Sequence, residues 1–333
     1  MRCSPAADAI LVTGAAGFIG SAVVAGLAAT GRPVRAGVRG ARIPRVLPPS
    51  ATPTPCDLDA AAAVRAAVAG VGLVVHAAVG APAKMAAQCA TLLDAMTAAG
   101  TTALIYLSSV AVYGGRTGAI DETTPPAPLD AYGAAKAGCE RLVRAWADAE
   151  PHRRALILRP GIVYGTGSRF WIDKLAERIA VGAWGRFDAA QGRAALVHVD
   201  DVVALIGVAA ERLTAAETDP RLRCATLNVV GPDTPRWNGY FAALAARIGT
   251  PELRRIGRGE LWLRQAGLMA KIWRRLGLPG GRRLALAPLP GEIALFARDA
   301  SYATAAATDL LGFTATIGLA EGLARTAVPH PAG

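Results

Sequence analysis

Lysine and acidic residues are scarce in this chain of 333 residues. Only four of its 36 basic residues are lysines, and with 25 acidic residues its net charge of +11 is carried by arginine. Such an excess is typical of a coding sequence rich in G and C, and it also favours attraction to a phosphate, a pyrophosphate, a nucleic acid or a lipid surface. No motif for RNA or DNA binding accompanies the charge, so we expect no nucleic-acid partner.

Cysteine is also sparse. The five cysteines are widely scattered and include no Cys-x-x-Cys pair, which argues against a disulfide framework and a zinc site. We therefore expect a cytoplasmic location and no bound metal. The uncharged run 9–31 is long enough to cross a bilayer, but the four glycines from Gly14 to Gly26 divide it into a strand, a loop and a helix. We predict no membrane span and no signal peptide.

Short apolar runs alternate with alanine-rich stretches through the first half of the chain, in the rhythm of βαβ units. Most of the runs are apolar throughout, as in a parallel sheet whose two faces are both covered by helices. The expected fold is therefore an α/β Rossmann-type doubly wound parallel sheet. The predicted strands are residues 10–13, 33–38, 73–76, 103–107, 155–158 and 226–230, and the predicted helices are 18–30, 59–69, 85–99 and 132–150.

After about residue 165 this rhythm changes. A helix is expected over 168–182, an extended segment over 196–199 and a helix over 200–212, followed by a stretch dense in Arg, Gly, Pro and Leu. We predict a smaller C-terminal lobe that closes over the substrate. The predicted division is a dinucleotide-binding core at 1–167, completed by about 196–230, with a substrate-binding lobe at 168–195 and 231–333.

A glycine-rich loop joins the first predicted strand to the first predicted helix. Its glycines let the backbone turn sharply and approach a pyrophosphate, and the helix start supplies amide donors and positive potential. A purely structural turn is the alternative, but the position at the first βα turn favours a dinucleotide. The loop residues expected to bind it are Gly14, Gly17, Phe18, Ile19 and Gly20.

Arg39 follows the second predicted strand, where an acidic residue would bind the ribose 2′-hydroxyl of NAD(H). An arginine there accommodates a 2′-phosphate, so Arg39, with Arg42 and Arg35 nearby, favours NADP(H) over NAD(H). An exposed arginine on a loop of an arginine-rich protein is the other interpretation. Asp57 and Leu58 fall where adenine contacts are expected, although Asp57 also suits the start of a helix.

Tyr132 and Lys136 lie four residues apart, one turn along the same face of a predicted helix. A free tyrosine has a pKa near 10, so a nearby cation must lower that pKa before the phenol can exchange protons at neutral pH. Lys136 could also bind the nicotinamide ribose. Ser109 ends a predicted strand at its carboxyl end, where ligands bind in open α/β sheets, and its hydroxyl could hold the substrate oxygen.

Six segments, in order, resemble the extended short-chain dehydrogenase/reductase family, which includes the NAD-dependent epimerases and dehydratases. They are residues 13–20, 76–78, 108–114, 132–136, 158–165 and 197–202. The resemblance implies catalytic roles for Ser109, Tyr132 and Lys136. It also implies that Ala77 and Ala78 line the cofactor cleft and that Pro160, Ile162 and Val163 lie near the nicotinamide. His198 is expected to support the backbone between the lobes.

Two departures from the nucleotide-sugar members argue against a nucleotide-sugar substrate. Gly161 and Ile162 stand where those members carry an Asn, and Ala194 stands where they often carry an Arg. The stretch 159–165 is more similar to the hydroxysteroid dehydrogenase and dihydroflavonol reductase branch. The leading hypothesis is thus an oxidoreductase that exchanges hydride between NADP(H) and a secondary alcohol or ketone. The alternatives are a nucleotide-sugar epimerase or dehydratase with tightly bound cofactor, and a cofactor-binding protein without turnover.

Residues 261–275 can form a basic amphipathic helix. The sequence leaves three roles open for it: packing on the lobe with solvated arginines, a lid over an apolar or lipid-like substrate, or a patch for peripheral membrane contact. The expected partners are a small-molecule substrate and a second copy of the chain. The homodimer is expected through the helices at 85–99 and 132–150, because these are alanine-rich and the family commonly pairs them in a four-helix interface.

Overall fold

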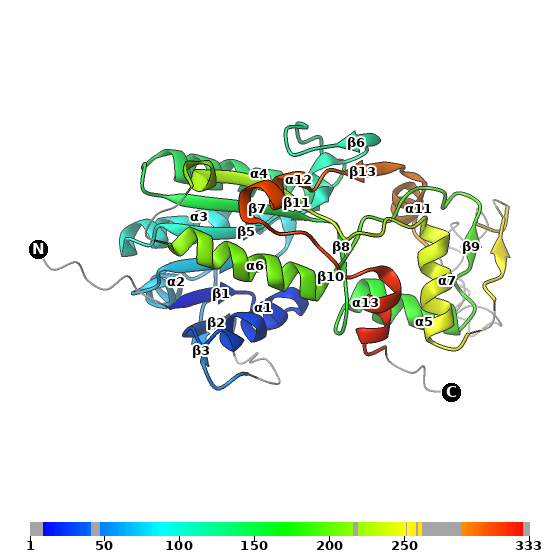
Figure 1. The fold of residues 1–333 in the computed structure, drawn as a ribbon, viewed down its shortest axis with the longest axis horizontal. Coiled ribbons are helices and arrows are strands. Elements are labelled where there is room, and N and C mark those ends of the chain that lie inside the picture. Colours follow the sequence, from blue (N-terminus) through cyan, green and yellow to red (C-terminus); the bar gives the residue numbers. More distant parts are fainter. Residues whose placement is uncertain are drawn as a thin grey trace, which may run out of the picture.

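The computed structural model describes residues 9–40, 47–215, 219–250, 252–257, 259–261 and 288–328. Its centre is a sheet of seven parallel strands in the order β11-β7-β5-β4-β1-β2-β3 (Figure 1). The strands are β1 (Ile10–Thr13), β2 (Val34–Val38), β3 (Ala51–Pro55), β4 (Leu73–His76), β5 (Ala103–Leu107), β7 (Arg154–Pro160) and β11 (Cys224–Val229). The predicted Rossmann-type α/β fold is confirmed.

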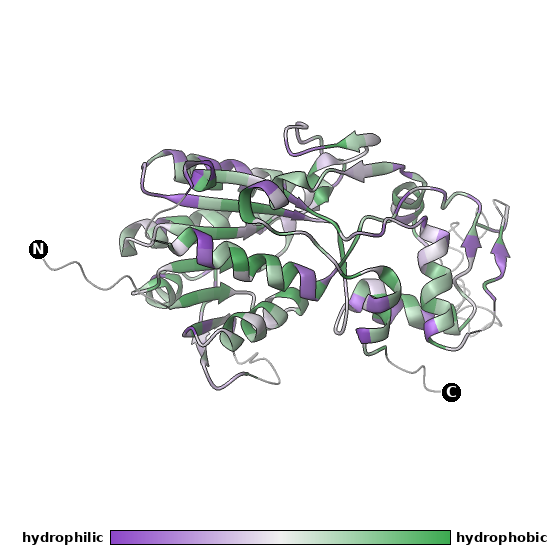
Figure 2. Ribbon diagram, in the orientation of Figure 1, coloured by the Kyte–Doolittle hydropathy of each residue, from purple (hydrophilic) through white to green (hydrophobic). Residues whose placement is uncertain are grey.

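Two apolar clusters form the core, one on each face of the sheet. Successive side chains of a strand point to opposite faces, so Ile10 and Val12 join one cluster and Leu11 joins the other. Figure 2 shows the strands and the inner helix faces as predominantly hydrophobic. The helices packed on the first cluster are α1 (Phe18–Ala29), α6 (Val199–Thr214) and α12 (Ala305–Leu311), and those on the second are α2 (Ala61–Val68), α3 (Pro82–Ala99) and α4 (Ala131–Asp148).

β3 is the strand of this sheet that was not among the predicted ones. Its sequence, Ala-Thr-Pro-Thr-Pro, contains two prolines and mostly exposed residues, so it lacks the apolar run that identified the others. Proline cannot donate a ladder hydrogen bond, which confines such a strand to the edge of a sheet. β3 lies at that edge, paired with β2 alone.

A third apolar cluster lies away from the sheet and is rich in aromatic side chains. Trp237 and Phe296 pack with ring centroids 4.6 Å apart, and Trp184 meets Phe187 edge to face at 5.1 Å. The elements around it are β8 (Ile162–Tyr164), η2 (Arg169–Asp173), α5 (Lys174–Ala180), β9 (Arg186–Phe187), β10 (Leu196–His198), α7 (Trp237–Arg247), β12 (Arg255–Ile256), α11 (Pro290–Ala297) and α13 (Leu319–Arg325).

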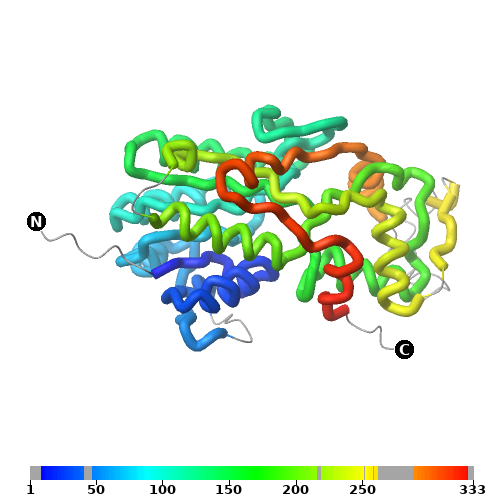
Figure 3. Tube along the Cα trace, in the orientation of Figure 1, coloured from blue at the N-terminus to red at the C-terminus, as the bar shows by residue number. Residues whose placement is uncertain are grey.

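Long-range links join this cluster to the sheet. Strand pairs β8–β10, β9–β12 and β6 (Gly118–Ile120)–β13 (Ala300–Tyr302) bring together segments far apart in the sequence. Figure 3 shows the segment between α12 and α13 running from the side of the sheet to the third cluster. The Asp201 carboxylate fixes that segment by accepting hydrogen bonds from the backbone of Thr316 at 3.2 Å and Ile317 at 3.1 Å.

Two sequence expectations look different in the structure, and two lie outside it. The helix expected over 168–182 begins as the π-helical turn η2 and continues as the short helix α5. Of the basic stretch 261–275, the structure describes Leu261 alone, and Arg42 also lies outside the described residues. Within the described ranges, no helix combines the length and apolar character needed to cross a membrane.

Candidate active site

The loop between β1 and α1 is shaped by glycines that have no room for a side chain. Gly14 has φ +71°, and a Cβ on it would lie 2.6 Å from the Ala78 Cα. A Cβ on Gly20 would overlap the carbonyl oxygen of Gly14. Gly17 caps α1 without a side-chain bond, and the first turn of α1 carries no acidic residue. Phe18 and Ile19 begin the helix there, so its amides and positive potential can serve an anionic group.

The wall beside this loop comes from the end of β4. Thr13 Oγ1 lies 2.7 Å from His76 Nδ1, and the Ala78 backbone N–H donates to Thr13 Oγ1 at 3.4 Å. Burial, and then the charge of Lys136, lower the pKa of His76 to about 3, so its imidazole is neutral. The structure brings Ala77 and Ala78 against the glycine loop, and their role in lining a cofactor cleft stays a prediction.

The residues expected at the adenosine end lie after β2 and β3. Arg39 is exposed, Leu58 is buried, and the Asp57 carboxylate accepts the backbone N–H of Asp59 at 3.1 Å. Arg35 is turned away from this place: its guanidinium donates to carbonyl oxygens of Ala67 and Ala69 at the end of α2, at 2.9 and 2.6 Å. Two of the arginines considered for the ribose are described. Arg39 lies at the end of β2, where the ribose is expected, whereas Arg35 points towards α2.

Asp59 is the acidic neighbour of Arg39. Its carboxylate accepts hydrogen bonds from Lys84 Nζ and Gln88 Nε2, each at 3.0 Å, and these bonds hold its pKa below the usual range, with a smaller contribution from the Arg39 charge. The positive charge of Arg39 therefore interacts with the negative charge of Asp59. No local sequence pattern indicates this arrangement, because Lys84 and Gln88 come from α3.

Ser109 and Tyr132 meet where β5 ends and α4 begins. Asp130 caps α4 by accepting the N–H of Gly133 at 2.7 Å, which places Tyr132 in the first helical turn. The Ser109 side chain lies near the Tyr132 hydroxyl. Burial raises the pKa of Tyr132, the interaction with Ser109 opposes that rise, and the Asp130 charge adds to it. Ser108, by contrast, is buried and donates to Glu140 at 2.6 Å, so Ser109 is the serine facing Tyr132.

Lys136 lies one turn along α4 from Tyr132 and is 1% exposed. Its Nζ donates to the Leu107 carbonyl at 2.5 Å and lies 5.9 Å from the centroid of the Tyr132 ring. Burial lowers the pKa of Lys136 to about 8, while the negative forms of Cys139, Cys89 and Glu140 raise it. A buried amine with such a pKa at the carboxyl end of a parallel sheet is typical of an active site.

Residues 160–163 connect β7 to β8 beside this centre. Pro160 ends β7, and a Cβ on Gly161 would overlap the carbonyl oxygen of Ala195, to which the N–H of Ile162 donates at 2.6 Å. Ile162 packs against the third apolar cluster, and Val163 is buried against the first. The position where nucleotide-sugar members carry an Asn thus faces apolar neighbours here.

His198 and the residues before it also have structural roles. His198 Nδ1 accepts the backbone N–H of Asp200 at 3.3 Å, which caps α6. Ala194 is completely buried, while Arg193 pairs with Asp299 at 3.3 Å. His198 therefore supports the backbone between the sheet and the third cluster, in line with its expected role.

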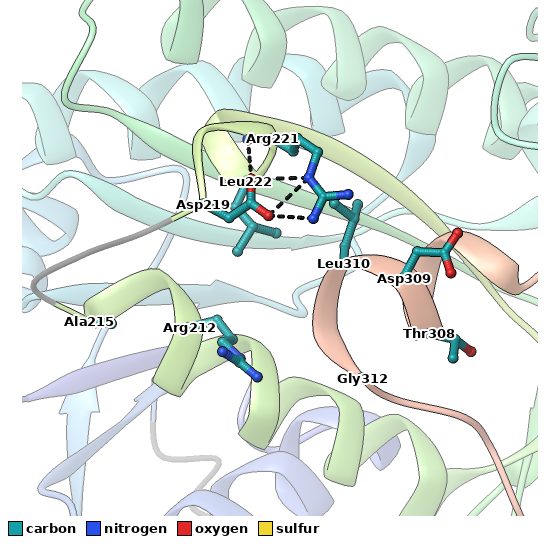
Figure 4. A pocket seen from close by; sticks show the side chains of 9 residues that line it. All are labelled: Arg212, Ala215, Asp219, Arg221, Leu222, Thr308, Asp309, Leu310 and Gly312. Carbon is teal, nitrogen blue, oxygen red and sulfur yellow. Dashed lines mark hydrogen bonds and ion pairs between the residues drawn. The ribbon is translucent and has the colours of Figure 1, made fainter.

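A separate cavity of about 360 Å³ lies between the end of α6, η3 (Pro220–Arg223) and α12. Figure 4 shows the Asp219–Arg221 ion pair on its wall, with closest atoms 2.6 Å apart. None of its lining residues belongs to the centre described above. They are Arg212, Ala215, Asp219, Arg221, Leu222, Thr308, Asp309, Leu310 and Gly312.

Comparisons with known proteins agree with this geometry. Residues 10–222 match the model of the NAD dependent epimerase/dehydratase family. Over 116 residues the chain is 33% identical to N-acetyl-alpha-D-glucosaminyl-diphospho-ditrans,octacis-undecaprenol 4-epimerase of Escherichia coli O157:H7. That match covers 34% of this chain and 35% of the relative, so it spans about a third of the relative's length.

Two solved structures are similar over nearly the whole chain. MoeE5 in complex with UDP-glucose and NAD is 26% identical, with a TM-score of 0.70 over 95% of this chain and 96% of that one. UDP-glucose 4-epimerase from Thermotoga maritima, with UDP-glucose, is 22% identical, with a TM-score of 0.71 over 96% and 97%. The second likeness concerns the fold alone.

Proposed function

Because the chain belongs to the NAD-dependent epimerase/dehydratase family, we propose that it is an epimerase that inverts a ring carbon of a sugar bound through a diphosphate. The sequence favoured net exchange of hydride with an alcohol or ketone. At the coarser level that prediction holds, since an NAD(P)-dependent enzyme of this family is shown. The comparisons support the epimerase alternative better, because one relative is a 4-epimerase of a polyprenyl-diphosphate sugar and one similar structure contains UDP-glucose and NAD.

The observation that carries the proposal is the placement of the Tyr132 hydroxyl near the Ser109 side chain and beside the buried amine of Lys136. Ser109 holds the hydroxyl of the reacting carbon, and Tyr132 accepts its proton. When bound, the nicotinamide group supplies the hydride acceptor and donor. Tyr132 then returns the proton to the same oxygen after the sugar has presented its other face, so the reaction consumes no cofactor.

The cofactor would lie along the carboxyl ends of the strands. The glycine loop and the start of α1 would hold its pyrophosphate, Ala77 and Ala78 would line its cleft, and Lys136 would bind the nicotinamide ribose. The fit is supported by the Gly14 and Gly20 positions, where a Cβ would collide with the backbone. We further propose that Arg39 favours NADP(H), although the MoeE5 complex contains NAD.

For the substrate we propose a hexose diphosphate ester whose other end is either a nucleoside or a polyprenyl chain. Both ends occur in the names of the similar proteins, and both share the diphosphate that a protein of charge +11 would attract. The proposed location is the cytoplasm. The division into a core and a substrate lobe remains part of this proposal.

The experiment offers purified protein UDP-glucose, UDP-N-acetylglucosamine and a polyprenyl diphospho-N-acetylglucosamine, each with NAD or NADP. Sugar configuration is followed by NMR and nicotinamide oxidation state by absorbance. The proposal expects interconversion of epimers without net change in the cofactor. A net change in the nicotinamide oxidation state without epimerisation would instead establish the net oxidoreductase. Tight cofactor binding without any turnover would favour the non-catalytic alternative.

A further inference from the structure

A buried ion pair lies directly behind the catalytic centre. Glu140 is 2% exposed and sits one turn beyond Lys136 on α4. Its Oε1 accepts hydrogen bonds from Ser108 Oγ at 2.6 Å and Arg159 Nε at 2.9 Å, and its Oε2 accepts one from Arg159 Nη2 at 2.6 Å. Such a bidentate arginine–carboxylate pair has a fixed geometry as well as a strong attraction.

The two partners of Glu140 are adjacent in the sequence to predicted site residues. Ser108 precedes Ser109, and Arg159 precedes Pro160. Arg159 Nη1 also donates to the Tyr113 hydroxyl at 2.8 Å, and that hydroxyl lies 2.7 Å from Asn228 Oδ1. The bonds therefore tie the ends of β5, β7 and β11 to α4, the helix that carries Tyr132 and Lys136.

Lys136 needs such a neighbour, because burial disfavours its charged form. Leu107 supplies a carbonyl oxygen, and His76 is neutral at physiological pH. Among the described groups that raise the pKa of Lys136, the negative forms of Cys139 and Cys89 come first, and Glu140 is the carboxylate, buried one turn away on α4. The titratable groups around Lys136 are Tyr132, Cys139 and Glu140 on α4, Cys89 on α3, Tyr106 on β5 and His76 on β4.

We infer that Glu140, held in place by Arg159, is a positioning residue of the active site whose negative charge favours the protonated form of Lys136. The inference rests on the proposed function for the importance of that proton, since a cationic Lys136 is what would favour the Tyr132 phenolate. Lys136, Glu140 and Arg159 all belong to the protein, so the titration of Lys136 can be measured without a substrate.

The two partners of the pair should affect Lys136 in opposite directions. Glu140→Gln removes the negative charge and leaves Arg159 unpaired near the amine, which lowers the pKa of Lys136. Arg159→Gln leaves Glu140 negative and unpaired, which raises that pKa. A purely structural role would make the two variants alike, because both break the same ion pair.

The scarcity of lysine makes a direct measurement practical. Protein labelled with ¹³C and ¹⁵N in lysine should give four side-chain signals, and a Lys136→Met variant identifies the one from Lys136. In the wild type its titration midpoint is expected at a pH of about 8. Glu140→Gln should lower the midpoint by about one pH unit and Arg159→Gln should raise it by about as much, as for charges a few ångströms away.

Arg144→Gln is the control that should fold in any case. Arg144 is 38% exposed, and its guanidinium lies 3.7 Å from Glu140 Oε2. At low ionic strength its removal should raise the Lys136 midpoint slightly, and less than Arg159→Gln does. If Glu140→Gln and Arg159→Gln do not fold, a small rise of the Lys136 midpoint in Arg144→Gln supports the inference. A lower midpoint in Arg144→Gln would overturn it.

Midpoints that stay put, or that move the same way in Glu140→Gln and Arg159→Gln, would also overturn the inference. The proposed function fails independently of it. If the wild type does not epimerise the sugars but the Lys136 midpoints shift in opposite directions as expected, the proposed function is wrong and the inference about Glu140 stands. If the wild type epimerises the sugars but the midpoints do not shift, the proposed function stands and the inference about Glu140 is wrong.

Discussion

Tyr132 carries the one hydroxyl whose loss tests the proposed proton transfer most directly. Tyr132→Phe keeps the ring and removes the titrating group, so turnover should fall by about 10²- to 10⁴-fold, the usual contribution of general acid–base catalysis. Cofactor affinity should stay within about threefold of the wild-type value, whereas a loss of about 1.4 kcal/mol would weaken it tenfold. Steady-state kinetics and cofactor titration measure the two effects.

Tyr302→Phe is the matched control for that prediction. It removes the same atom from a tyrosine whose hydroxyl accepts a hydrogen bond from Arg298 at 2.7 Å. Its turnover should stay near that of the wild type. If Tyr132→Phe retains most of the wild-type rate on the true substrate, the proposed mechanism is wrong.

Arg39 is the residue on which cofactor choice should depend. A hydrogen bond to a charged group contributes about 1.5–3 kcal/mol, so Arg39→Ala should weaken NADP(H) binding roughly ten- to a hundredfold and leave NAD(H) nearly unchanged. Arg35→Ala serves as the control, because Arg35 binds α2 carbonyls and should affect stability without changing the preference. Equal affinities of the wild type for both cofactors would contradict the prediction.

The glycine-rich turn between β1 and α1 should tolerate no side chain on its inner surface. A Cβ on Gly20 would overlap the Gly14 carbonyl, so Gly20→Ala should displace the loop, reduce stability by about 1–3 kcal/mol and weaken cofactor binding. Gly207, also helical, has open space around it. Gly207→Ala should therefore stabilise the protein by roughly 0.5–1 kcal/mol. Thermal unfolding with and without cofactor tests both, and equal responses of the two variants would contradict this account.

Local pattern was sufficient to locate most elements around the site. Leu73–His76 and Ala103–Leu107 agree with the predicted bounds, because buried parallel strands have continuous apolar runs. β3 has no continuous apolar run, because it is an edge strand with two prolines and mostly exposed residues. The pairs β6–β13 and β9–β12 could not be predicted, since each joins short segments that are distant in the sequence and carry no pattern of their own.

At the scale of the whole molecule, the sequence identified the residues of the centre but not what surrounds them. Ser109, Tyr132 and Lys136 were predicted from spacing and resemblance, and the fold brings them together. Glu140 and Arg159 were missed as partners because they lie on different elements, and Asp59 was missed beside Arg39 for the same reason. Only the packing of β5, β7 and α4 against one another creates the buried pair.

The homodimer remains a prediction, and the outer surfaces of α3 and α4 supply its argument. The two helices pack side by side on the second cluster, and each presents a stripe of mostly small residues to solvent. The stripes are Ala87, Thr91, Asp94 and Ala98 on α3, and Ala134, Gly138, Arg141 and Ala145 on α4. Small side chains allow close helix approach, and a two-fold interface would use this same surface on both subunits.

Sedimentation equilibrium at micromolar concentration should therefore give about twice the chain mass of 34.1 kDa. Ala145→Arg adds bulk and charge to the α4 stripe at a distance from Tyr132, so it should shift the protein to monomer. Ala242→Arg makes the same change on the exposed surface of α7 and should leave the dimer intact. A wild-type protein that sediments only as a monomer would contradict the prediction. A dimer that survives Ala145→Arg but dissociates in Ala242→Arg would instead place the interface on the side of α7.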